Sequence, residues 1–252
     1  MQSAATQLPL FPPEADKPGI LPGFSVRESN RAKRLSIKVF PRGNVEVVVP
    51  RRTRARDVQS FVDENREWIE RARKAFAANH PPEDFELPRC IRLPAIDRVV
   101  RVHYAGRSGA TSVGYRYSRG ILTLAGATAN DALCVAAIRR WLAATAKREF
   151  EPRLRALSAL TESAYARMHV RAQRSCWGSR SSSGTISLNL CLLFLDPSLL
   201  RYLMIHELCH GRHMNHSTRF WRRVKCFEPD YRALDRALGE AWRDVPAWLG
   251  LY

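Results

Sequence analysis

The pentapeptide His206-Glu207-Leu208-Cys209-His210 constrains this 252-residue chain more than any other feature. On an α-helix, residues i and i+4 lie on one face roughly 6 Å apart, so both imidazoles can bind one small cation. Glu207 then stands beside that cation, where a general base is needed. Two histidines and a glutamate in this spacing are a signature of zinc hydrolases. The motif therefore predicts two zinc ligands, His206 and His210, and a catalytic glutamate, Glu207.

The residues before the motif predict that it lies inside a helix. Asp196 can cap a helix by accepting a backbone N–H bond, and Pro197 suits the first helical position because its missing N–H has no intrahelical partner there. The apolar side of this helix is formed by Leu199, Leu200, Leu203 and Cys209. We expect this side to pack on a core while the two histidines face a cleft.

A catalytic zinc usually has three protein ligands and keeps one position for water, so a third ligand is needed. His213 would share the histidine face of a continued helix, but it lies roughly 10 Å beyond His206 along the axis. Gly211 allows the helix to end, and a chain that turns back would bring His216 to the metal. We therefore favour His216 over His213 or a distant carboxylate.

Several segments around the motif carry a family resemblance. They are Cys176-Trp177-Gly178-Ser179, Gly184-Thr185-Ile186-Ser187-Leu188-Asn189, Asn215-His216-Ser217 and Phe220-Trp221. With the histidine motif between them, they resemble the YgjP-like metal-dependent hydrolases, which are related to the SprT-like zinc metallopeptidases. The resemblance is specific over residues 174–224 and weaker over residues 24–76. One departure is that Arg180 follows Ser179, where the family commonly has a cysteine.

The resemblance implies a site and a fold. It implies that His206, His210 and His216 bind Zn²⁺ and that Glu207 is the catalytic acid/base. We expect an α+β fold in which a β-rich N-terminal portion precedes a zincin-like metallopeptidase core. The expected organisation is a flexible tail over residues 1–20, a strand-rich portion with two helices over 21–160, and the catalytic core over 161–252.

Periodicity predicts the elements of the N-terminal portion. Apolar residues alternate over 35–39 and 45–49 around a turn at 41–44, which is typical of a hairpin. A helix follows from Thr53 or Asp57, and its apolar side comprises Val58, Phe61, Val62, Trp68, Ile69 and Ala72. Short strands are expected over 99–102, 113–117 and 121–124. A long helix then runs from Ala132 toward Leu157, and the pattern leaves open a break near Pro152.

The formal charge of +17 raises the question of a polyanionic partner. The basic excess is dense between residues 89 and 119, where only one acid, Asp97, accompanies the arginines Arg89, Arg92, Arg98, Arg101, Arg107, Arg116 and Arg119. This segment is either a solvated arginine-rich sheet surface or a surface that binds nucleic acid or nucleotide. The sequence has no run of about 18 apolar residues, so we expect no membrane contact. Six scattered cysteines without a C-x-x-C pair favour a cytoplasmic protein.

The expected activity is peptide hydrolysis, with Glu207 activating a zinc-bound water. The strand over 184–189 is expected to offer an edge to an extended peptide substrate. Candidate substrate-binding residues are Trp177, Ser179, Arg180 and Asn189. One alternative is hydrolysis of nucleoside triphosphates, with Arg171, Arg174 and Arg180 binding phosphate. Another is a nucleic-acid-associated protein whose protease acts on DNA-bound partners.

Overall fold

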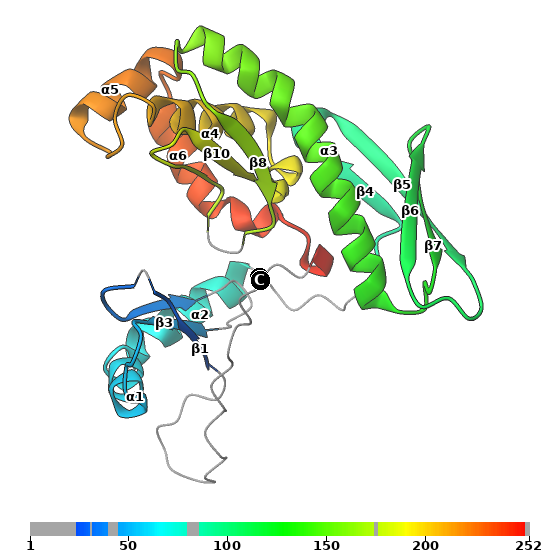
Figure 1. Ribbon diagram of the computed structural model, residues 1–252, viewed down its shortest axis with the longest axis horizontal. Coiled ribbons are helices and arrows are strands. Elements are labelled where there is room, and N and C mark those ends of the chain that lie inside the picture. Colours follow the sequence, from blue (N-terminus) through cyan, green and yellow to red (C-terminus); the bar gives the residue numbers. More distant parts are fainter. Residues whose placement is uncertain (1–23, 31, 40–44, 80–85, 174–175, 250–252) are drawn as a thin grey trace. The chain divides into compact units, whose positions relative to one another are not determined.

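The computed structural model describes residues 24–30, 32–39, 45–79, 86–173 and 176–249 (Figure 1). Contacts divide the chain into two compact units, and the boundary between them along the sequence follows residue 82. The sequence-based boundary at residue 160 differs from this division, because the long helix that ends there packs inside the second unit. The expected tail over residues 1–20 and the turn over 41–44 lie outside the described residues.

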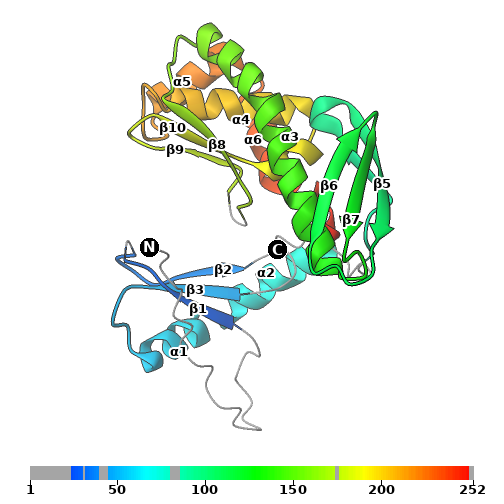
Figure 2. The ribbon, with the colours of Figure 1, turned by 45° about the vertical axis from the view of Figure 1, so that its right-hand side comes forward.

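The first unit contains a three-stranded sheet. Its strands are β1 (Phe24–Glu28), β2 (Ser36–Val39) and β3 (Val45–Val49), in the order β1-β3-β2. The strands β2 and β3 are antiparallel with Val39 opposite Val45, so the paired strands of the predicted hairpin are confirmed. The strand β1 pairs with β3 in parallel, as Figure 2 shows. Val45, Val47 and Val49 of β3 are buried because they pack against Val58, Val62 and Ile69 from the helical part that follows.

Two helices complete the first unit where one was expected. They are α1 (Ala55–Glu64) and α2 (Arg66–Asn79). The chain changes direction at Asn65, whose side-chain amide donates to the carbonyl of Phe61 at 2.8 Å. Val58, Val62 and Ile69 are buried as predicted. The prediction for Trp68 was wrong, since 46% of its surface is exposed.

The second unit begins with a four-stranded sheet. Its strands are β4 (Cys90–Leu93), β5 (Arg98–Gly106), β6 (Val113–Ser118) and β7 (Ile121–Gly126), in the order β4-β5-β7-β6. The strands β5 and β7 are parallel, and the other two pairs are antiparallel. One face of the sheet is covered by α3 (Asp131–Leu160), with the rings of Tyr117 and Trp141 5.6 Å apart (Figure 1). The three short strands expected in this region are thus confirmed.

The helix α3 is continuous through Pro152. Its first turn is capped by Asn130, whose side chain accepts a bond from the N–H of Leu133 at 3.1 Å. Proline removes one helical hydrogen bond, but Phe150 and Leu154 on either side of it are fully buried. Burial of the flanking turns therefore holds the helix together where the sequence left a break open.

A second, three-stranded sheet carries the residues around the histidine motif. Its strands are β8 (Arg167–Arg171), β9 (Gly178–Arg180) and β10 (Thr185–Asn189), in the order β8-β10-β9. The expectation that residues 184–189 form a free edge was wrong, because β10 lies between β8 and β9. The edges of this sheet are β8 and β9.

Helices follow the second sheet. They are α4 (Pro197–Cys209), α5 (Thr218–Phe227) and α6 (Tyr231–Glu240), with short 3-10 turns over Pro94–Ile96, Leu190–Phe194, Ala241–Asp244 and Ala247–Leu249. The mixed α and β content predicted from the sequence is confirmed. Among the described residues, no helix has the length and apolarity needed to cross a membrane.

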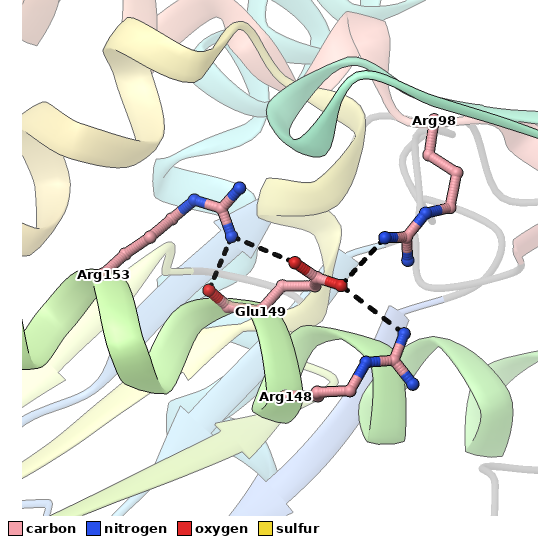
Figure 3. A network of polar contacts seen from close by, with 4 residues as sticks. All are labelled: Arg98, Arg148, Glu149 and Arg153. Carbon is pink, nitrogen blue, oxygen red and sulfur yellow. Dashed lines mark hydrogen bonds and ion pairs between the residues drawn. The ribbon is translucent and has the colours of Figure 1, made fainter.

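A carboxylate on α3 joins this helix to the four-stranded sheet. Glu149 accepts bonds from Arg98 of β5 at 2.9 Å and from Arg153 at 3.2 Å, and Arg148 lies 3.5 Å away (Figure 3). Burial alone would raise the pKa of Glu149, but hydrogen bonds from Arg98 and Arg153, and the nearby charges of Arg98 and Arg148, lower it overall. The ionised form of this carboxylate therefore stabilises the fold.

We expect Glu149→Gln to lower the free energy of unfolding by about 1 to 2 kcal/mol at neutral pH. Since the pKa of Glu149 is lowered in the folded state, its contribution is present above the ordinary pKa of 4.5 and disappears as the pH falls through the lowered value. Urea unfolding between pH 3 and 7 checks this, with Glu151→Gln as the matched control on the same helix. A difference between the two variants that does not shrink on acidification would contradict the assignment.

Candidate metal centre

Three histidines converge at one end of α4. His206 and His210 lie one turn apart on this helix, and His216 follows in the segment between α4 and α5. One ring nitrogen from each lies within 4.8 Å of the others. The Nε2 atoms of His206 and His216 are 3.0 Å apart. The sequence-based choice of His216 over His213 thus agrees with the placement of the imidazoles.

The local sequence positions these histidines through helix caps. The Oδ1 atom of Asp196 accepts a bond from the N–H of Ser198 at 2.8 Å, so the predicted start of α4 is confirmed. The side chain of Ser217 accepts a bond from the N–H of Phe220 at 3.4 Å and starts α5. Only residues 210–216 separate the end of α4 from the Ser217 cap of α5, so His216 is held next to α4.

Hydrogen bonds to the second ring nitrogen orient two of the imidazoles. Nδ1 of His210 lies 3.0 Å from the carbonyl oxygen of His213. Because a carbonyl only accepts, Nδ1 carries the proton and Nε2 keeps its lone pair. Nδ1 of His206 lies 3.4 Å from the hydroxyl of Tyr202, which donates to Asp235 at 2.7 Å. This chain of bonds leaves Nε2 of His206 available to a cation.

The aromatic rings of Phe220 and Trp221 pack against the histidines. The buried ring of Phe220 stacks on His210 with centroids 4.5 Å apart. Trp221 stacks on His216 at 5.5 Å and on Tyr231 at 5.2 Å. These ring contacts restrict the rotation of the imidazoles.

Burial keeps His206 and His210 neutral. Burial, with smaller effects from His210 and His216, lowers the pKa of His206 to about 3. Burial also lowers the pKa of His210, partly opposed by the bond to the His213 carbonyl. Neutral imidazole is the form that binds a metal ion, so the site is prepared for one.

Glu207 is a buried carboxyl group with one oxygen that has no partner. Only 4% of its surface is exposed, and Oε2 makes no hydrogen bond to any described residue. Burial raises the pKa of Glu207 to about 8, partly opposed by the charge of Arg180. A Cβ atom at Gly178 would lie 3.1 Å from Oε1, so this glycine of β9 makes room for the carboxylate. An unsatisfied buried oxygen of this kind is typical of a group that works on a bound molecule.

Arg180 lies near the same carboxylate. Its Nη2 atom donates to the carbonyl of Ala164 at 2.7 Å, and its buried Nη1 atom has no partner in the described part of the chain. Burial lowers the pKa of Arg180, opposed by the charge of Glu207. A Cβ atom at Gly211 would lie 3.0 Å from Nη2, so the guanidinium also reaches the end of α4. Arg180 therefore brings an unpaired donor to the neighbourhood of the histidines.

Two other candidate substrate-binding residues lie in the framework. The indole N–H of Trp177 donates to the carbonyl of Leu238 at 2.9 Å, and its ring stacks on Trp242 at 4.0 Å. Asn189 is fully buried and donates to the carbonyls of Gln173 and Cys176 at 2.8 and 2.9 Å. Neither side chain has a polar atom left for substrate. Ser179, in contrast, is exposed on β9.

Sequence reasoning missed three groups that orient the histidines. Tyr202 precedes His206 by four residues on the same helix. Because side chains at this spacing lie on one face, the sequence could have indicated their contact. Asp235 lies on α6, and no local pattern connects it to the motif. His213 was considered only as a ligand, whereas its main-chain carbonyl is the group that contacts His210.

The framework role of Asn189 predicts a loss of stability on substitution. We expect Asn189→Ala to lower the free energy of unfolding by about 2 to 4 kcal/mol, because two buried carbonyls and the N–H of Cys191 lose their partner. Ser179→Ala, on the adjacent strand, should change it by less than about 0.5 kcal/mol. Urea titration of both variants checks this, and equal stabilities would place Asn189 outside the framework.

Comparisons with known proteins give a family and a similar solved structure. The chain is similar to the crystal structure of the metallopeptidase zymogen of Pyrococcus abyssi abylysin, with 25% identity and a TM-score of 0.34 over 38% of this chain and 98% of that one. No curated protein matches the sequence. The model of the YgjP-like family, described as a metallopeptidase domain, matches residues 33–241 and includes all three histidines and Glu207. The chain belongs to the YgjP-like family and carries its metallopeptidase domain.

Proposed function

We propose that the protein is a zinc-dependent metallopeptidase in which Glu207 is the general base. One observation carries the proposal: three imidazoles converge beside a buried carboxylate, one oxygen of which has no partner among the described residues. The family gives a metal-dependent peptidase in general terms. The metal and the role of Glu207 are inferred from the residues themselves.

The donor set favours zinc among the common metal ions. Three imidazole nitrogens, with no fourth protein ligand found among the residues that the structure describes, suit a catalytic zinc, which keeps its fourth position for water. Two ligands about 2.0 to 2.1 Å from a tetrahedral zinc ion lie about 3.3 Å apart, and the Nε2 atoms of His206 and His216 are 3.0 Å apart. When bound, a zinc ion lowers the pKa of a coordinated water molecule and polarises a carbonyl group.

The chain's own residues supply the proton transfers. Glu207 accepts a proton from the water that attacks the peptide carbonyl and then gives it to the leaving amine. Burial raises the pKa of this carboxyl to about 8, which favours the protonated form that acts as the acid in the second step. The unpartnered Nη1 atom of Arg180 is a suitable donor to a substrate carbonyl oxygen.

The edge strand β9 is the best candidate for peptide binding. It pairs with β10 on one side only, so its other side offers main-chain N–H and C=O groups. Gly178 places this strand against Glu207, and Arg180 ends it. An extended peptide that pairs with β9 would therefore run past the catalytic carboxylate.

Nucleotide hydrolysis has weaker support from the same region. Arg171 is exposed on β8, which lies on the opposite side of β10 from Arg180. Arg180 is already bonded to the carbonyl of Ala164. Arg174, the third arginine of that hypothesis, lies outside the described residues. The described arginines thus do not form one phosphate site.

We expect Glu207→Gln to retain bound zinc but to lose peptidase activity by at least about 100-fold. The reason is that the three nitrogen ligands are unchanged while the proton acceptor is removed. Atomic emission measures the metal, and cleavage of an unfolded polypeptide measures the activity. The control is Glu240→Gln, an exposed glutamate on α6. Activity equal to that of the control would remove Glu207 from the mechanism.

We expect Tyr202→Phe to weaken zinc binding by about 10 to 100-fold, because Nδ1 of His206 loses the oxygen that orients its ring. Asp235→Asn should have a smaller effect in the same direction. Competition with a chromophoric chelator measures the affinity, which does not depend on turnover. Tyr231→Phe is the control, since the hydroxyl of Tyr231 lies 3.3 Å from Arg232 and contacts no histidine. Equal affinities in both tyrosine variants would contradict this role.

A further inference from the structure

The four-stranded sheet of the second unit has one face that α3 does not cover. Residues alternate along each strand, and Val100, Leu122 and Leu124 are buried on the face that packs against the rest of the unit. The residues between them point to the other side, here called the open face, and the argument uses Arg92, Val99, Arg101, His103, Arg116 and Ile121. All six are exposed, and Val99 is 62% exposed.

The strand register arranges three arginines of the open face in a diagonal. Arg92 of β4 lies opposite Val99 of β5, and Arg101 lies two residues further along β5. On the next strand, Thr123 of β7 lies opposite His103 of β5. Arg116 of β6 in turn lies opposite Thr123. These three arginines form a stripe that crosses all four strands and advances four residues along them. At ordinary sheet spacings this is a span of about 20 Å.

The charge of this stripe is not compensated within the described residues. Arg92, Arg101 and Arg116 make no ion pair there, and none of the strand positions on the open face is Asp or Glu. Arg98, one residue before Val99, points to the opposite face and is paired with Glu149 (Figure 3). On β5, Arg98 is thus paired on the covered face, whereas Arg101 on the open face has no ion pair among the described residues.

The residue types on the open face favour double-stranded over single-stranded nucleic acid as the anionic partner. Single-stranded nucleic acid is usually bound by aromatic side chains that stack on bases. The aromatic residues of β6, Tyr115 and Tyr117, alternate with Arg116 and so belong to the other face. A surface of unpaired arginines without tyrosine, phenylalanine or tryptophan matches the regularly spaced phosphates of a duplex.

We propose that the open face binds double-stranded nucleic acid through its phosphates, without reading the base sequence. The proposal does not depend on the metal centre or on peptide hydrolysis. Arg92, Arg101 and Arg116 contact phosphates along the diagonal, and each contact releases condensed counterions. Affinity must therefore fall steeply as salt is added.

The test uses the full chain and a fluorescent DNA duplex of about 20 base pairs of mixed sequence, with anisotropy measured over a salt series. In the test variant Arg92, Arg101 and Arg116 are each replaced by Gln. The control variant replaces Arg155, Arg167 and Arg236 by Gln, which removes the same charge from three other exposed positions. We expect the test variant to bind at least about tenfold more weakly and to lower the salt slope by about 2 to 3. The control should stay within about twofold of the unaltered protein.

Several outcomes would overturn the proposal. They are equal effects of the two triple variants, absence of duplex binding at low salt, and tighter binding of a single strand of the same length. Binding to vesicles of phosphatidylcholine and phosphatidylserine that is lost in the test variant, with duplex binding unchanged, would assign the face to a membrane instead. If circular dichroism shows that the triple variant does not fold, Arg101→Gln is compared with Arg167→Gln instead. The expected change in the salt slope of the affinity is then about 1.

Discussion

The burial of α4 is the constraint on which the metal centre depends. Nearly every residue from Leu199 to Cys209 is buried, and the helix is packed by α3, α5 and α6. A helix in this position cannot turn its histidines toward bulk water, so His206 and His210 remain neutral and close together. The same burial places Glu207 in a poorly solvated environment and raises its pKa to about 8. The packing that stabilises the unit thus also produces the chemistry of the site.

The strand β9 connects this helix to the region where substrate would bind. Its glycine, Gly178, lets the strand approach Glu207 to within the distance of a side-chain contact. Trp177 and Asn189 fix the position of the strand through buried hydrogen bonds on either side of it. Residues near the carboxylate therefore divide into those that hold β9 in place and those, such as Arg180, that keep an unpaired donor. The sequence motif alone does not distinguish residues that hold β9 from residues that keep a free donor.

Local patterns allowed much of the fold to be predicted, and long-range contacts account for most of what was missed. The hairpin strands, the start of α4 and the convergence of His216 on the motif follow from alternation, capping and ligand spacing, which depend on neighbouring residues. The central position of β10 depends on pairing with β8 and β9, so periodicity within the strand did not reveal it. Asp235 reaches Tyr202 across 33 positions of the chain. Trp68 was assigned to the core because it follows the apolar spacing, but the break at Asn65 begins a new helix in which that residue is exposed.

The third histidine differs from the other two in what supports it. His206 and His210 are part of a buried helix, whereas Gly211, Arg212, Met214, Asn215 and His216 are all exposed. Segments with few buried contacts open at a much lower free energy than the whole domain. An ion held by the three imidazoles would therefore exchange with solution by release of one ligand while α4 remains folded. The lifetime of the loaded enzyme in the presence of a chelator is then governed by this short segment and is uncoupled from global unfolding.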